Sequence, residues 1–254
     1  MITSTAQMYE DLADEFDQAV PFYSTFGRVM VDTIDPPRGS ALLDLAAGRG
    51  AVARPAQERG CSVTAVDAAP SMVAHLRQDL PQGSIHVMDV HDLAFEDATF
   101  DIVTAGFAVN LFEYPARVVQ EAYRVLKAGG LLAFTLPGGK NESGDLSFCN
   151  RLYAEFSRYL PVFERPIVHV LETESVLEGA GFTDVACQEI TAEVEIPDSE
   201  AAWEFLTKNG TGELILSLPH PQQDKFRKRV DEAFERLNRV AVLRRTVHLW
   251  SGRR

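Results

Sequence analysis

The sequence predicts an α/β fold built on a doubly wound, mostly parallel sheet of seven strands. Short apolar runs alternate with helical segments over residues 41–137, at the spacing of β-α-β units. These runs are apolar along their whole length, as expected for strands that helices cover on both faces. Several runs end at a glycine or an aspartate, so polar residues gather where strands stop. The length of 254 residues suits one large domain.

The first half follows this alternation closely. Residues 1–35 have a helical pattern, and Pro36-Pro37 ends it. Two later helices begin at Pro70 and Pro115, because proline fits the first turn of a helix. We expect strands at 41–45, 62–66, 84–88, 100–105 and 131–136, and helices between Gly50 and Gly60, from Pro70, and over 115–127.

The second half departs from simple alternation. The sequence predicts a helical insert at 145–163, helices at 173–180, 199–208 and 221–238, and strands at 182–190 and 241–250. We expect residues 1–254 to form one domain. Within it, 1–35 would make an N-terminal helical lid, and 140–170 and 191–240 would be insertions beside the ligand.

The charge balance argues against nucleic acid as a partner. The chain has 37 acidic and 24 basic residues, a formal net charge of −13, which repels a phosphate backbone. Residues 225–254 are basic, with ten Lys or Arg against three acids. That segment is either a nucleic-acid patch or a solvated helix face, and its acids at helical spacing favour the second interpretation.

Three separated cysteines, Cys61, Cys149 and Cys187, form neither a disulfide framework nor a metal-binding pair. No apolar run approaches the roughly 18 residues of a membrane span. Acidic residues crowd positions 10–17, unlike a secretory signal. We therefore expect a cytoplasmic protein without a membrane span.

The loop after the first strand is the richest candidate site. Gly48 and Gly50 allow a ligand to lie against bare backbone at the start of a helix. Asp67 ends the second strand, where a carboxylate can accept hydrogen bonds from both ribose hydroxyls. These features predict an adenosine site. They also fit the dinucleotide fingerprint, with Ala53 as its last position, so an NAD(P)-linked oxidoreductase stays an alternative.

Two carboxylates favour a ligand other than a dinucleotide. Asp44 precedes Gly48 by four residues, where it would oppose a pyrophosphate but suits a cationic ligand. Asp89 ends the third strand, where its carboxylate and the next backbone N–H can read the N6 and N1 edge of adenine.

Taken in order, these motifs resemble the class I S-adenosylmethionine-dependent methyltransferases. The nearest likeness is to the small-molecule branch related to the ubiquinone and menaquinone methylases. The motifs that carry it are Leu42 with 44–50, Val66-Asp67, Met72, Asp89-Val90, 100–107 and 124–130. The resemblance implies a Rossmann-like fold, S-adenosyl-L-methionine as cofactor with S-adenosyl-L-homocysteine as product, and methylation of oxygen, nitrogen or carbon on a small organic acceptor.

The same resemblance implies a role for each strand-end loop. Gly48 and Gly50 would flank the methionine moiety, with Asp67 at the ribose. Asp89 and Val90 would hold adenine. The remaining cofactor contacts would come from Asp44, Ala46, Ala68, Met72 (on the adenine face), Ala105 (its carbonyl on the methionine ammonium), Phe107 and Asn110. Arg49 departs from the family pattern, because it puts a cation near a sulfonium.

Catalytic residues are harder to predict. Tyr9 in the N-terminal lid and His169 after the insert are the candidates for a general base, with Tyr23 and His220 as weaker ones. The aromatic insert either lines an apolar acceptor pocket or packs into a core; its rings are Phe148, Tyr153, Phe156, Tyr159 and Phe163. The expected partner is the small-molecule acceptor, and a homodimer is left open.

Three other interpretations were weighed. Tyr123-x-x-x-Lys127 copies the spacing of short-chain dehydrogenases, but Tyr123 shares an ordinary amphipathic stripe. The polar cluster His86, Asp89, His91 and Asp92 is better explained as a strand end than as a metal site, so no metal is expected. A protein that binds ligand on this fold without methylating is the remaining alternative.

Overall fold

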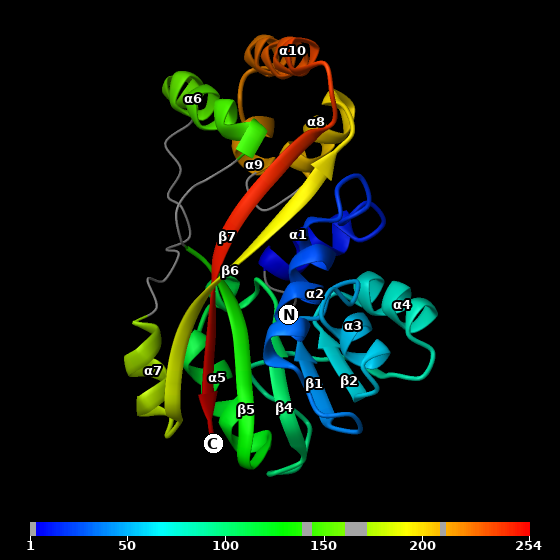
Figure 1. The fold of residues 1–254 in the computed structure, drawn as a ribbon, viewed down its shortest axis with the longest axis vertical. Helices are drawn as coiled ribbons and strands as arrows, with labels where there is room; N and C mark the ends of the chain where they lie inside the picture. The colour runs from blue at the N-terminus through cyan, green and yellow to red at the C-terminus, as the bar shows by residue number, and fades with distance from the viewer. Residues whose placement is uncertain (1–3, 139–143, 161–171, 209–211) are drawn as a thin grey trace.

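A computed structural model gives the fold of residues 4–138, 144–160, 172–208 and 212–254 (Figure 1). One sheet runs through it in the order β3-β2-β1-β4-β5-β7-β6. The first five strands are parallel, and β7 is antiparallel to both of its neighbours. The strands are β1 (Ala41–Leu45), β2 (Ser62–Asp67), β3 (Ser84–Val87), β4 (Phe100–Ala105), β5 (Leu126–Pro137), β6 (Thr183–Ile196) and β7 (Ala241–Arg253). The predicted doubly wound, mostly parallel sheet is confirmed.

Helices cover both faces of this sheet, which explains why its central strands are continuously apolar. On one face α2, α3 and α4 share an apolar core with β1 and β2, and on the other α5 packs against β5 while α7 packs against α5 and β6. The helices are α1 (Ser4–Leu12), α2 (Phe22–Ile34), α3 (Ala53–Glu58), α4 (Pro70–Asp79), α5 (Pro115–Val125), α6 (Ser147–Phe156), α7 (Thr173–Gly179), α8 (Ser199–Thr207), α9 (Gly212–Leu216) and α10 (His220–Leu237).

Several element ends differ from the sequence prediction. The helix expected to reach Lys127 ends at Val125, because Leu126 already pairs with Phe100 of β4. The strand expected over 182–190 continues to Ile196, and its partner β7 continues to Arg253. The short helix α9 was not predicted.

The extra length of β6 and β7 forms a two-stranded arm. Residues 191–196 pair with 241–246 beyond the last contact between β7 and β5. Figure 1 shows the arm rising from the sheet to α6, α8, α9 and α10, which we call the cap. The cap has its own apolar core, in which Val194 and Leu243 of the arm meet Phe226 of α10.

The N-terminal helices connect the cap and the sheet. Helix α2 lies directly on the loop before α3, since a Cβ atom at Gly27 would lie only 2.0 Å from the carbonyl oxygen of Ala51. At its start, Phe22 contacts Phe205 of α8, with ring centroids 5.5 Å apart. This arrangement places residues 4–20, which we call the N-terminal segment, over the carboxyl ends of the strands.

Candidate cofactor site

The turn after β1 has a backbone shape that favours glycine. Gly48 and Gly50 have φ values of 53° and 83°, and Ala46 also lies in the left-handed region at 50°. A Cβ atom at Gly50 would lie 2.5 Å from the Cδ1 atom of Leu76, whereas one at Gly48 would meet only the Phe16 ring, at 4.0 Å. The turn therefore presents bare backbone at Gly48, with one aromatic ring above it.

Asp67 ties the end of β2 to this turn. Its Oδ2 atom accepts a hydrogen bond from the Gly48 amide at 2.7 Å, and Oδ1 accepts one from the Ala69 amide at 2.9 Å. Burial raises the pKa of this carboxyl, although the backbone hydrogen bonds oppose the rise. A buried carboxylate thus lies beside exposed backbone, at the predicted ribose position.

Asp44 is a second buried carboxylate at the same edge. It accepts hydrogen bonds from the Ala53 amide at 3.1 Å and from the Thr104 hydroxyl at 2.9 Å. Burial raises its pKa to about 7, and the charge of Asp67 adds to the rise. Within the described ranges, neither aspartate forms an ion pair with Lys, Arg or His. Negative charge without a cation gives this edge an affinity for a positively charged ligand.

The N-terminal segment covers these strand ends. Glu10 accepts hydrogen bonds from the Ser71 amide at 2.9 Å and hydroxyl at 2.6 Å, which caps the start of α4. Arg49 donates to the carbonyl oxygen of Asp14 at 3.2 Å. Phe16 packs with Met72, which is only 1% exposed. The predicted adenine-facing residue Met72 is therefore covered by Phe16 of this segment.

Tyr9 belongs to the same cover. Its ring meets Phe16 edge-on, with centroids 5.7 Å apart. Burial and the charge of Asp67 raise the pKa of the Tyr9 phenol to about 12, so it is neutral at pH 7 and can donate a hydrogen bond. The second predicted catalytic residue, His169, lies outside the described residues.

The loop after β3 carries the predicted adenine contacts. Asp89 is 67% exposed, and its Oδ1 atom accepts from the His91 amide at 2.9 Å and from ring atom Nδ1 at 2.6 Å. Partial burial disfavours the ionised form of Asp89, but the hydrogen bonds from His91 favour it more strongly. The pKa of Asp89 is therefore lowered from its usual value. Val90 is buried at 6% exposure. One Asp89 oxygen is thus occupied by His91, and the other is available to a ligand.

The exit of β4 supplies the opposite wall. Ala105 is buried, and Phe107 has a left-handed backbone with φ of 56°. The Phe107 amide donates to the Thr135 hydroxyl at 2.9 Å. Two buried polar atoms near these strand ends, Nε2 of His91 and Oδ1 of Asn110, have no hydrogen-bond partner within the described part of the chain. Such atoms are rare unless a ligand or water completes them.

The structure brings most predicted cofactor residues to one edge, at the ends of β3, β2, β1 and β4. Ala68 is exposed beside Asp67 at that edge. Sequence reasoning missed Glu10, Phe16 and Thr104, whose partners lie at least 32 residues away and leave no local pattern. The hydrogen bond from the His91 amide to Asp89 could have been expected from the sequence. An Asp side chain at a strand end often accepts from the amide two residues later, which forms an Asx turn.

Two alternative enzyme sites do not assemble. Lys127 lies in β5 and pairs with Asp101 at 2.8 Å, while Tyr123 packs on Phe182, so the dehydrogenase-like pair does not form. His86 contacts the Ser84 hydroxyl at 2.8 Å. No group of three metal-ligating side chains occurs in the part of the chain that the structure describes.

The basic C-terminal segment and the aromatic insert have structural roles. Along α10, Arg227 pairs with Asp231 and Arg236 with Glu232, each at 3.2 Å and four residues apart, as on a solvated helix face. Phe156 of the insert packs on Phe226, with centroids 5.2 Å apart, inside the cap core. Among the described residues, no helix is long and apolar enough to cross a bilayer.

Comparison with known proteins finds similarity to methyltransferases. Residues 43–134 match the family described as "Methyltransferase domain". Aklanonic acid methyltransferase from Streptomyces sp. (strain C5) is 30% identical over 141 residues, covering 52% of this chain and 64% of that protein. Demethylmenaquinone methyltransferase from Paenarthrobacter aurescens is 27% identical, covering 73% and 81%. Nocamycin O-methyltransferase from Saccharothrix syringae is 34% identical, covering 51% and 50%.

Solved structures share the fold. The YcgJ protein from Bacillus subtilis superposes with a TM-score of 0.56 at 18% identity, covering 89% of this chain and 96% of that one. Haemonchus contortus phosphoethanolamine N-methyltransferase 2, in complex with S-adenosyl-L-methionine, gives 0.55 at 15% identity, covering 97% and 60%. The [4+2]-cyclase SpnF gives 0.50 at 16% identity, covering 91% and 81%.

In its sheet order and strand-end site, and in the sequence of residues 43–134, the chain is similar to S-adenosylmethionine-dependent methyltransferases. Among these proteins, it resembles aklanonic acid methyltransferase and demethylmenaquinone methyltransferase. The residues present fit the cofactor. Asp44 and Asp67 supply uncompensated negative charge for a sulfonium and an ammonium, and Gly48 supplies open backbone.

Proposed function

We propose that this protein methylates an oxygen atom of a small organic acid, with S-adenosyl-L-methionine as the methyl donor. The observation that carries the proposal is the pair of buried carboxylates, Asp44 and Asp67, beside the open backbone of Gly48; neither forms an ion pair with a basic side chain in the described ranges. A pyrophosphate would be repelled there, whereas a sulfonium is attracted by ionised carboxylates and favours the ionised form of both groups.

Each strand-end loop receives a proposed role. Asp67 accepts hydrogen bonds from the ribose hydroxyls, and Asp89 with the Val90 amide holds the adenine edge. Asp44 acts on the positive charge from beneath the turn, since its side chain is almost completely buried and bonds to Ala53 and Thr104. The remaining proposed contacts are Ala46, Gly48, Gly50, Ala68, Met72, Ala105, Phe107 and Asn110.

The acceptor class follows from the chemistry of Tyr9. When bound, the cofactor supplies an electrophilic methyl group on a positively charged sulfur. A phenol whose pKa is about 12 is a poor base at neutral pH, so Tyr9 is better suited to donate a hydrogen bond. A carboxylic acid ionises near pH 4 and is a nucleophile without a base. Two relatives are named for aklanonic acid and for O-methylation of nocamycin, which supports this class.

The chain's own contribution to such a reaction is position and a dry site. Glu10 and Arg49 hold the N-terminal segment over the turn, and Phe16 places an apolar ring above Gly48. Exclusion of water strengthens the electrostatic interactions inside the site. We propose that the acceptor enters beside this segment, on the side of the cap.

Two measurements test the proposal. Isothermal titration calorimetry should show binding of S-adenosyl-L-homocysteine and no binding of NAD or NADP. Incubation with S-adenosyl-L-methionine and a panel of aromatic polyketide acids and quinones should give a methyl ester of at least one acid by mass spectrometry. Binding of NAD in place of S-adenosyl-L-homocysteine would overturn the proposal, and methylation of quinones alone would overturn the acceptor class.

A second candidate is a protein that binds the cofactor without methylating. It is supported by the fold that the chain shares with SpnF, a [4+2]-cyclase. This candidate requires tight binding of S-adenosyl-L-homocysteine together with no methylated product from any acceptor class, including acids that carry a diene.

A further inference from the structure

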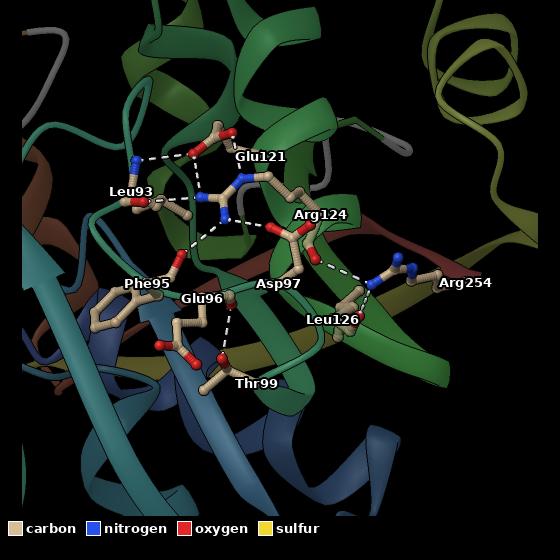
Figure 2. A network of polar contacts seen from close by, with 9 residues as sticks. All are labelled: Leu93, Phe95, Glu96, Asp97, Thr99, Glu121, Arg124, Leu126 and Arg254. Carbon is tan, nitrogen blue, oxygen red and sulfur yellow. Dashed lines mark hydrogen bonds and ion pairs between the residues drawn. The ribbon is translucent and has the colours of Figure 1, made fainter.

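The side chain of Arg124 fastens the loop that joins β3 to β4 to α5 (Figure 2). An arginine has five N–H donors, and all five are used here. Two go to the Glu121 carboxylate at 2.9 and 2.8 Å, and one goes to Asp97 at 2.8 Å. The other two go to the carbonyl oxygens of Leu93 at 2.8 Å and Phe95 at 2.7 Å. One planar guanidinium thus binds two carbonyl oxygens and one carboxylate of the loop, together with the carboxylate of Glu121 in α5.

Further contacts surround Arg124 and Glu121, which together we call the clamp. The second Glu121 oxygen also accepts from the Leu93 amide at 2.8 Å, so Leu93 is held through both its amide and its carbonyl. Beyond Asp97, the Ala98 amide donates to the Arg124 carbonyl at 3.0 Å. Arg254 donates to that same carbonyl and to Leu126, which fixes the end of α5 (Figure 2). The clamp is therefore anchored on both sides.

The clamped residue lies close to the predicted adenine contacts. Leu93 is three residues after Val90, and both are buried in the same apolar core. Between them the chain turns tightly, because the Asp92 amide donates to the Asp89 carbonyl at 3.2 Å. A displacement of Leu93 must therefore move the peptide between Asp89 and Val90.

We propose that Arg124 is a positioning residue for adenine recognition, acting through Leu93 on the Asp89 carboxylate and the Val90 amide. The inference rests on the proposed function, in which those two groups read adenine. Lysine cannot replace arginine in this role, because it has three donors and no planar fork. It can keep an ion pair with Glu121 or Asp97, but it cannot also hold both carbonyl oxygens.

The test compares two ligands that differ only at the edge of the base. Calorimetry gives the dissociation constants of S-adenosyl-L-homocysteine and of S-inosyl-L-homocysteine, in which an oxo group replaces the adenine amine. The unmodified protein should prefer the adenine compound by about tenfold, the worth of one or two hydrogen bonds. In Arg124→Lys the preference for the adenine compound should be about threefold or less.

Arg59→Lys is the matched control. Arg59 also bridges two acids, Asp32 at 2.6 Å and Asp35 at 2.5 Å, and its side chain is 35% exposed against 31% for Arg124. It joins α3 to α2, away from the loop, so its replacement should leave the ligand preference unchanged. If Arg124→Lys lowers the melting temperature but leaves the preference for the adenine compound unchanged, the role of Arg124 is merely structural.

If Arg124→Lys does not fold, Glu121→Gln tests whether this contact affects the preference for the adenine compound. The amide can still accept from Leu93 but loses the charge that faces Arg124, so part of the preference should be lost. Retention of the full preference in the folded variant overturns the inference while the proposed function stands. An unmodified protein that binds both ligands equally also overturns it. Failure to bind either ligand instead refutes the proposed function.

Discussion

The amide of Gly48 donates a 2.7 Å hydrogen bond to Oδ2 of Asp67. This contact joins the turn after β1 to the end of β2, and it holds the carboxylate beside the open face of the glycine. Since Asp67 also accepts from Ala69, its orientation is fixed before any ligand arrives. A preorganised acceptor of this kind loses little entropy on binding.

Replacing Asp67 by alanine should weaken binding of S-adenosyl-L-homocysteine by about 2 kcal/mol, the cost of leaving ribose hydroxyls unpaired. The Gly48 amide also loses its acceptor, so the turn should loosen. Calorimetry measures the effect. Asp79→Ala, which removes a surface acid paired with Arg54 at 3.6 Å, is the control and should bind normally. An unchanged affinity in Asp67→Ala would show that the ribose lies elsewhere.

Asp44 should make stability depend on pH in an unusual direction. Burial raises its pKa from 3.8 to about 7, so the folded state holds an extra proton between those values. The free energy of unfolding should therefore fall as the pH rises from about 4 to 7, by on the order of 2–4 kcal/mol. Urea denaturation of the protein and of Asp44→Asn at several pH values measures this. The decline should be smaller in the variant, in which the raised pKa of Asp67 still contributes.

A control of opposite sign is available for that experiment. Lys127 holds the pKa of Asp101 below its usual value, so the stability from Asp101 is present above pH 4 and is lost as the pH falls further. Asp101→Asn should therefore leave the slope between pH 4.5 and 7 unchanged. Equal slopes for Asp44→Asn and the unmodified protein would contradict the role of Asp44.

Ala46→Gly should stabilise the protein. A left-handed backbone costs alanine roughly 1–2 kcal/mol, and glycine loses roughly 0.5–1 kcal/mol more on folding, so the net gain is about 0.5 kcal/mol. Ala47→Gly is the matched control, because Ala47 is a buried neighbour without positive φ, and it should destabilise by about 1 kcal/mol. Thermal unfolding distinguishes the two; loss of stability in both variants would be evidence against strain at Ala46.

Glu10→Ala should release the N-terminal segment from α4. It removes a carboxylate that caps Ser71, which is worth about 1 kcal/mol, and residues 4–20 should exchange their amide hydrogens faster. Asp11→Ala is the control, since Asp11 contacts only Gln7 of its own helix among the described hydrogen bonds. Hydrogen exchange with mass spectrometry measures both. Identical exchange in the two variants would show that Glu10 does not hold the segment.

Local sequence patterns were enough for the first half of the sheet. Proline at the first turn marked α4 and α5, and apolar runs marked β1, β2 and β4. The long ends of β6 and β7 were not predicted, although residues 191–196 alternate between polar and apolar positions, with Glu193 and Glu195 facing solvent. That alternation is the pattern of a half-buried strand, so this part of β6 was open to prediction from the sequence, whereas its pairing with 241–246 was not.

The sequence alone determined which residues end the strands: Asp44, the turn with Gly48 and Gly50, Asp67 and Asp89. Backbone conformation and strand ends depend on neighbours in the chain, so a local pattern carries that information. Only the tertiary structure showed that Phe16 covers Gly48, that Glu10 caps α4, and that Arg124 clamps Leu93. Those contacts join residues 31 or more positions apart, and their energy comes from packing and burial that no local pattern records.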